Sequence, residues 1–235
     1  MRLDELFRNL GELAGTIGAQ IKHGAMPGVP LGELDLTGPA PCELSLTGPG
    51  RVVVSQGELF RIDVQQSAAA EAVRFQLDET RLGVVGGDRD AVVKVTLPAL
   101  KGVAVAGSGR ITVDTLEPGA DVSIAGSGRV ELAEIAGGTL AVSIAGSGRL
   151  YADGRVDALE LSIAGSGSCD AEGLTVGKAA VHIAGSGDAI FTCNGHVSAS
   201  LMGSGNVIVR GSARCTVHGV GSGTVMCERE RESAD

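Results

Sequence analysis

The tripeptide Gly-Ser-Gly occurs seven times at nearly constant spacing, and this repeat limits the fold more than any other feature. Each copy starts 19, 20, 19, 20, 18 and 18 residues after the one before it. The first glycines of the seven copies are Gly107, Gly126, Gly146, Gly165, Gly185, Gly203 and Gly221. Such a period is typical of one small unit repeated along an axis, in which each unit buries the apolar edges of its neighbours.

Apolar and small polar residues alternate on both sides of each repeat. Residues 122–124 read Val-Ser-Ile and residues 161–163 read Leu-Ser-Ile, and alternation resumes after the tripeptide, as in Ile-Thr-Val at 111–113. A period of two indicates strands with one inward face. A second turn follows in each unit, as in Glu-Pro-Gly at 117–119. The sequence therefore predicts an all-β fold, a parallel β-helix or β-solenoid with coils of about 20 residues.

The rest of the chain divides around these coils. Residues 101–227 hold the regular coils, and residues 33–100 are less regular, although Leu-Thr-Gly-Pro at 36–39 recurs at 46–49. We expect residues 33–100 to form the first coils of one solenoid over residues 33–227, and the alternative is a small separate β-domain. Residues 228–235 form a charged tail.

Residues 1–23 are predicted to form a short amphipathic α-helix, followed by a Gly/Pro linker at 24–32. The apolar side chains at helical spacing are Leu3, Leu6, Phe7, Leu10, Leu13, Ala14, Ile17 and Ile21. This helix could cap an open end of the solenoid, drive self-association, or lie on a membrane. The membrane role is the least favoured, because the segment balances its bases and acids and a membrane helix prefers a basic polar face.

Charge and composition narrow the classes of partner. The net charge is −9, which counts against binding to nucleic acid. No stretch is long and apolar enough to span a membrane, and residues 1–10 do not resemble a secretory signal. A cytoplasmic location is expected, with peripheral attachment to the inner membrane as the alternative.

Five cysteines without a Cys-x-x-Cys pair are expected to be reduced thiols. Four of them stand at inward positions, where they would act as small core hydrophobes. These four are Cys169, Cys193, Cys215 and Cys227. No cofactor and no metal site is predicted.

An arginine column is the first candidate surface. Arg110, Arg129 and Arg149 each follow a Gly-Ser-Gly directly, so parallel stacking would place them one above another. We expect a solvated ladder or a strip that binds an anionic polymer or partner. Some acid is expected to compensate the charge, and the outward residues Asp114, Asp153 and Glu172 are the candidates.

An apolar strip is the second candidate surface. Ile190, Ile208 and Met226 share an outward column, two residues beyond the arginine column. An exposed strip of this kind usually marks a contact surface. With the apolar side of the N-terminal helix, namely Leu3, Leu6, Phe7, Leu10, Leu13 and Ile17, it forms the candidate protein interface. The alternative is that the alternation slips here and these side chains turn inward.

These motifs resemble those of a bacterial family, the putative auto-transporter adhesin, head GIN domain family. The quoted features are Ser-Ile-Ala-Gly-Ser-Gly at 123–128, 143–148 and 162–167, Thr-Leu-Pro-Ala-Leu at 96–100, and Val-Val-Val-Ser-Gln-Gly at 52–57. The resemblance covers about residues 33–227. It implies a right-handed β-helix and a binding or adhesive role, and it brings no catalytic residue.

The function expected from the sequence is a non-enzymatic, adhesin-like β-solenoid scaffold that self-associates or binds another protein. One alternative is a β-helix protein that binds or cleaves polysaccharide. Cleavage would need clustered carboxylates in a cleft, and no outward column gathers them. Another alternative is a cytoplasmic filament-forming solenoid, which rests on the fold alone.

Overall fold

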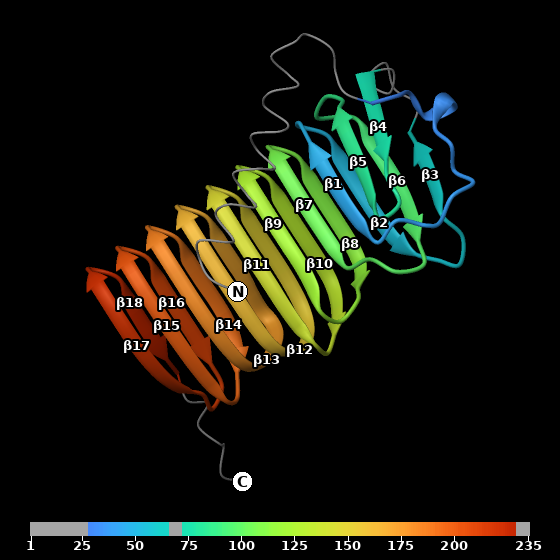
Figure 1. Cartoon of the computed structure of the whole chain (residues 1–235). Helices are drawn as coiled ribbons and strands as arrows, with labels where there is room; N and C mark the ends of the chain where they lie inside the picture. The colour runs from blue at the N-terminus through green and yellow to red at the C-terminus, as the bar shows by residue number, and fades with distance from the viewer. Residues whose placement is uncertain (1–27, 66–71, 229–235) are drawn as a thin grey trace.

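The computed structural model describes residues 28–65 and 72–228, and in these residues the protein is a β-solenoid (Figure 1). Each regular coil has a strand on one face, a Gly-Ser-Gly corner, and a strand on the opposite face. A short 3-10 helix, Leu31–Glu33, precedes the strands. The all-β solenoid predicted from the repeat is thus confirmed. The direction of winding stays a prediction, and the predicted N-terminal helix lies outside the described residues.

Face A contains the strands that precede the corners. In spatial order they are β5 (Arg81–Gly86), β1 (Glu43–Thr47), β7 (Gly102–Gly107), β9 (Ala120–Gly126), β11 (Thr139–Gly146), the second halves of β12 (Arg149–Gly165) and β13 (Ser168–Gly185), β15 (His196–Gly203) and β17 (Arg214–Gly221). All neighbours on this face are parallel, as a solenoid requires.

Face B contains the strands that follow the corners, and they are also stacked in parallel. In spatial order they are β6 (Val92–Leu97), β2 (Arg51–Gln56), β8 (Arg110–Leu116), β10 (Arg129–Ala136), the first halves of β12 and β13, β14 (Asp188–Cys193), β16 (Asn206–Arg210) and β18 (Thr224–Cys227).

The first coils are not stacked in chain order. β1 pairs with both β5 and β7, and β2 pairs with both β6 and β8, so the β1–β2 coil lies between the β5–β6 coil and the β7–β8 coil. Between β2 and β5 in the sequence, the chain forms β3 (Arg61–Val64) and β4 (Val73–Leu77). β3 runs antiparallel to β6, and β4 runs antiparallel to β5. These two strands cover the N-terminal end of the stack (Figure 1).

Each corner is held by backbone hydrogen bonds to the corner before it. The N–H of Ser127 donates to the carbonyl of Gly107 (2.9 Å), and the N–H of Arg129 donates to the carbonyl of Gly109 (2.9 Å). Gly126 has φ of +110°, and a Cβ there would lie 2.6 Å from the Gly107 oxygen. A side chain at this position would therefore be both strained and in collision with the neighbouring coil.

The interior is filled by the aliphatic columns that the alternation predicted. Ile124, Ile144 and Ile163 are stacked in register on face A and are at most 1% exposed. Phe75 and Phe191 are the largest fully buried side chains. The narrow interior explains why a chain almost without aromatic residues can fill it with Val, Ile, Leu and Ala.

Candidate binding surface

The three predicted arginines form one column at the start of the face B strands. Arg129 stands in register with Arg110 on one side and with Arg149 on the other. The structure adds a fourth member, Arg51, in register with Arg110. The signal for Arg51 was present in the sequence, because it follows Gly-Pro-Gly at 48–50, which occupies the place of a Gly-Ser-Gly corner.

Glu131 compensates the middle of this column. Its carboxylate lies 3.9 Å from Arg110 Nε and 3.7 Å from Arg129 Nη1, and it accepts a hydrogen bond of 3.2 Å from Thr112 Oγ1. The Arg129 guanidinium also lies over the Tyr151 ring, 5.1 Å from its centre. Arg110 and Arg129 are therefore engaged within the protein.

The prediction that Asp114, Asp153 and Glu172 compensate the arginines is wrong. None of them forms an ion pair with the column among the described residues, and Glu172 instead binds Arg210 at 3.0 Å. The reason is distance along the strand. A residue two positions from an arginine lies about 7 Å away on the same side, whereas one four positions away lies about 13 Å away.

Arg149 differs from Arg110 and Arg129. It is exposed, and no side chain in residues 28–65 or 72–228 forms an ion pair or hydrogen bond with its guanidinium. It lines one end of a groove of about 490 Å³ on the outer side of face B. Arg149 thus offers an unpaired positive charge at the mouth of a concave surface.

The groove runs across the last coils between two outward columns. The column that starts with Arg149 continues through Ser168, Asp188, Asn206 and Thr224, and the adjacent column contains Tyr151, Asp170, Ile190, Ile208 and Met226. We call this surface the face B groove. It contains the end of the arginine column and the whole apolar strip, which were predicted from the sequence as two separate candidate surfaces.

The apolar strip points outward. Ile190 and Ile208 are half-buried and Met226 is 49% exposed, whereas Ala189 and Phe191 beside Ile190 are buried. The alternation therefore does not slip. The groove also has acids: Asp170 stands between Tyr151 and Ile190 in the strip's column, and Asp188 accepts hydrogen bonds of 3.0 Å from the backbone and side-chain N–H groups of Asn206.

Other titratable groups do not form a site with this groove. Partial desolvation raises the pKa of Asp121, and the charges of Glu43 and Glu160 raise it further, but these acids are on face A. Within residues 28–65 and 72–228, no three His, Cys, Asp or Glu side chains are placed to hold a metal ion. The described segments also contain no helix that could span a membrane.

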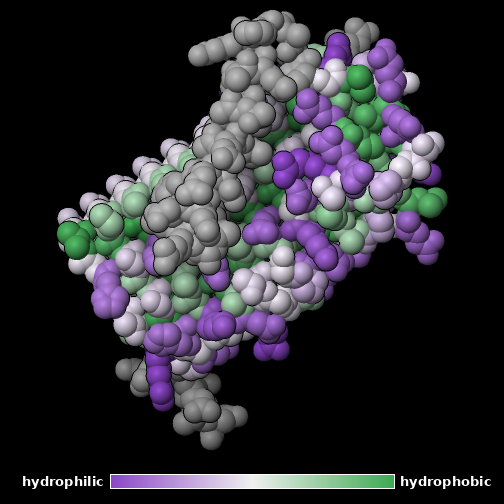
Figure 2. Space-filling view, viewed as in Figure 1, coloured by the Kyte–Doolittle hydropathy of each residue, from purple (hydrophilic) through white to green (hydrophobic). Residues whose placement is uncertain are grey.

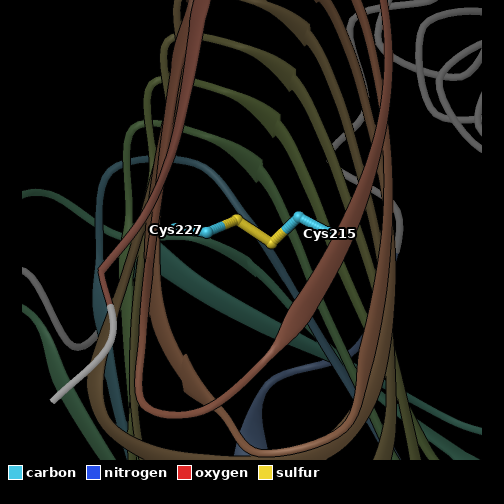
Figure 3. Close-up of a disulfide and its surroundings, with 2 residues drawn as sticks. All are labelled: Cys215 and Cys227. Atoms are coloured by element: carbon cyan, nitrogen blue, oxygen red, sulfur yellow. A yellow bond between two sulfur atoms is a disulfide. The ribbon is translucent and has the colours of Figure 1, made fainter.

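The cysteines divide into two kinds. Cys169 and Cys193 are buried in the core as predicted, and burial, with the charge of Asp170, raises the pKa of the Cys169 thiol to about 12. Cys215 and Cys227 also point inward, but they form a disulfide across the interior of the last coil (Figure 3). The prediction of reduced thiols is wrong for this pair. The turn between β17 and β18 places the two cysteines on opposite faces of the same coil, where they meet across the interior, and their spacing in the sequence does not reveal this.

The predicted interface residues of the N-terminal helix cannot be placed against this groove. They are Leu3, Leu6, Phe7, Leu10, Leu13 and Ile17, all outside the described residues. Their contact with Ile190, Ile208 and Met226 stays a prediction.

A sequence model of the putative auto-transporter adhesin, head GIN domain family matches residues 40–213, most of the solenoid. The chain belongs to this family. The resemblance noted in the Gly-Ser-Gly repeats is thereby confirmed. No curated protein matches the chain.

Solved structures share the fold of this family member at low sequence identity. A putative adhesin from Bacteroides fragilis has a TM-score of 0.73 and 17% identity, and the match covers 81% of this chain and 94% of that one. A putative lipid binding protein from Parabacteroides distasonis has a TM-score of 0.65 and 20% identity, over 82% and 94%. A putative adhesin from Parabacteroides merdae has a TM-score of 0.64 and 20% identity, over 81% and 92%.

Proposed function

We propose that this head GIN domain protein is a non-enzymatic, adhesin-like binding protein whose contact surface is the face B groove. The observation that carries the proposal is Arg149, which has no side-chain partner among the described residues and lies at one end of a groove that also holds the outward apolar strip. A solenoid face presents a long row of side chains with little freedom to move, which suits binding more than chemistry.

The best-fitting partner is a protein segment with aliphatic side chains and an acidic residue. The aliphatic side chains would cover Ile190, Ile208 and Met226, and the acid would pair with Arg149. An anionic polymer fits less well, because Glu131 and Tyr151 already engage Arg110 and Arg129, and Asp170 would repel a second negative charge in the groove.

A lipid is the second candidate. One structural neighbour is named a putative lipid binding protein, and an acyl chain could lie along the apolar strip with an acidic head group at Arg149. A polysaccharide is less favoured. The only tyrosine of the chain, Tyr151, has the Arg129 guanidinium over its ring, which leaves less aromatic surface for a sugar.

The protein is also proposed to act outside the cytoplasm and to associate with itself. A disulfide persists in oxidising compartments, so Cys215–Cys227 favours a site of action outside the reducing cytoplasm, in contrast to the expectation from sequence. Self-association is part of the same proposal, and the C-terminal end of the solenoid is the surface that would support it.

Panning a library of 12-residue peptides on the immobilised full chain tests the groove. Enriched peptides should combine two or three aliphatic residues with one acid, and both Arg149→Glu and Ile208→Asp should abolish their binding. Arg155→Glu is the matched control, because Arg155 is exposed on the same strand but does not line the groove. Circular dichroism should show that all three variants keep the β fold.

Two results would overturn the protein-binding proposal. One is retention of the enriched peptides by both groove variants. The other is the absence of peptide enrichment together with binding of phosphatidylglycerol vesicles that Ile208→Asp abolishes, which would establish the lipid candidate instead.

A further inference from the structure

Among the described residues, nothing is stacked over the interior of the solenoid at its C-terminal end. In the coil before last, the inward residues Ala199 and Leu201 are 0% and 4% exposed. In the last coil the inward Val217 is 48% exposed, and Val225 is only partly buried. Among the described residues, β17 is stacked only on β15 and β18 only on β16. Apolar side chains and strand edges therefore face outward here.

Exposed apolar residues gather at the same end. Seven large hydrophobic side chains are exposed in the described residues, and four of them belong to the last two coils: Met202, Val217, Val220 and Met226. Val220 is the most exposed of these, at 77%. Figure 2 shows hydrophobic surface at the tip of these coils. The N-terminal end differs, because β3 and β4 cover it and Phe75 is fully buried there.

The disulfide holds this uncovered end in shape. Cys215 stands on β17 of face A and Cys227 on β18 of face B, so the Cys215–Cys227 bond ties the two faces together across the interior (Figure 3). In every earlier coil, the coil above keeps the faces in place by hydrogen bonds. The last coil lacks that neighbour among the described residues. Here the disulfide holds the two faces at the separation that they have in the earlier coils, so another coil can stack on them.

The chain's own C-terminal tail is a poor cover for this end. Residues 229–235 read Arg-Glu-Arg-Glu-Ser-Ala-Asp and contain no large apolar side chain. Charged residues would lose hydration without filling the interior. A cover for this end must supply apolar side chains that residues 229–235 lack.

If residues 1–23 form the predicted helix, that helix cannot lie across this end while joined to Val29. Val29 pairs with Phe75 of β4, and nine strand-to-strand steps separate β4 from β17 on face A. At about 4.8 Å each, these steps span about 43 Å. Residues 24–28 extend over at most about 18 Å, so a helix lying across the far end could not remain attached.

We propose that a second copy of this chain docks there, C-terminal end against C-terminal end, as a two-fold dimer. Only another solenoid end offers strand edges at the same spacing and an apolar interior of the same outline. A two-fold axis across the end brings β17 against an antiparallel strand of the other copy, which strand edges accept readily. This inference rests on the self-association in the proposed function and names its surface.

Sedimentation velocity of the oxidised full chain at micromolar concentration tests the dimer. The wild type should sediment as a dimer, and Val217→Lys should shift it at least tenfold toward monomer, because two added charges would meet at the interface. Leu59→Lys is the matched control, since Leu59 is 72% exposed in the loop between β2 and β3, and it should leave the dimer intact. Far-ultraviolet circular dichroism should match in all three proteins.

A deletion of residues 1–27 tests whether the predicted N-terminal helix, and not this surface, causes the association. The deletion should still dimerise, and a monomer would show that the helix is the association element, which would overturn the proposal. A wild-type monomer, or a dimer unaffected by Val217→Lys, would also overturn it. Peptide binding to the groove should be unchanged in monomeric Val217→Lys, so failure of the dimer and failure of the proposed binding function can be told apart.

Discussion

The guanidinium of Arg129 lies over the ring of Tyr151, 5.1 Å from its centre, and the two residues come from neighbouring coils of face B. Together with the carboxylate of Glu131, this contact engages the middle of the arginine column. Arg149, the next residue in the column, stands in register with Arg129 but has no such partner among the described residues. The column is therefore uneven, and its Arg149 end coincides with the face B groove.

Replacing Arg129 with Ala should lower the free energy of unfolding by about 0.5–1 kcal/mol, the usual value of an exposed cation–π contact. Urea unfolding would measure the change. Arg155→Ala removes an exposed arginine of the next strand, β12, whose side chain has no partner among the described residues, and it should have a smaller effect. Equal losses in the two variants would show that the Tyr151 contact contributes nothing to stability.

Replacing Gly126 with Ala should destabilise the solenoid by about 2–3 kcal/mol. The left-handed φ of +110° disfavours a side chain, and the nearest obstacle is the backbone oxygen of Gly107, which cannot move without separating two coils. Ser127→Ala at the same corner changes only an exposed hydroxyl and should be nearly neutral. Thermal unfolding of the two variants gives the comparison, and similar melting temperatures would contradict the explanation.

Reducing Cys215–Cys227 should destabilise the last coil more than the rest of the solenoid. A link that closes a short loop contributes about 3 kcal/mol in the chain-entropy model, and in a solenoid such a loss stays near its source. Hydrogen exchange should therefore speed up in β17 and β18 on reduction and change little in β9–β11. The double variant Cys215→Ser/Cys227→Ser should show the fast exchange without reductant. Uniform acceleration along the chain would argue against a local effect.

Replacing Asp121 with Asn should stabilise the protein slightly at neutral pH. Desolvation and the nearby acids Glu43 and Glu160 raise the pKa of Asp121 in the folded state. The contribution of Asp121 to the free energy of unfolding is therefore most favourable when the carboxyl is protonated, and it is lost as the pH rises through that pKa. We expect a gain of less than about 1 kcal/mol at pH 7, because the side chain is at the surface. At pH 3 the variant and the wild type should have the same free energy of unfolding. If the variant were as much more stable at pH 3 as at pH 7, the charge of Asp121 could not be the cause.

Much of the fold could be predicted from local sequence. The spacing of the glycines gave the length of a coil, and alternation at residues 122–124 or 161–163 gave the direction of each side chain. These features involve residues that are adjacent in the chain or one coil apart. Stacking like on like then places Arg110, Arg129 and Arg149 in one column without further information.

The tertiary structure decided the features that depend on distant residues. The sequence could not show that the β1–β2 coil lies between two later coils, because the reversal through β3 and β4 has no period. It also could not show that Glu131 and Tyr151 leave only Arg149 unpaired among the three predicted arginines, or that Cys215 faces Cys227. Periodicity fixes which way a side chain points, whereas the partner it meets is set by how the coils are stacked and how the two faces meet across the interior.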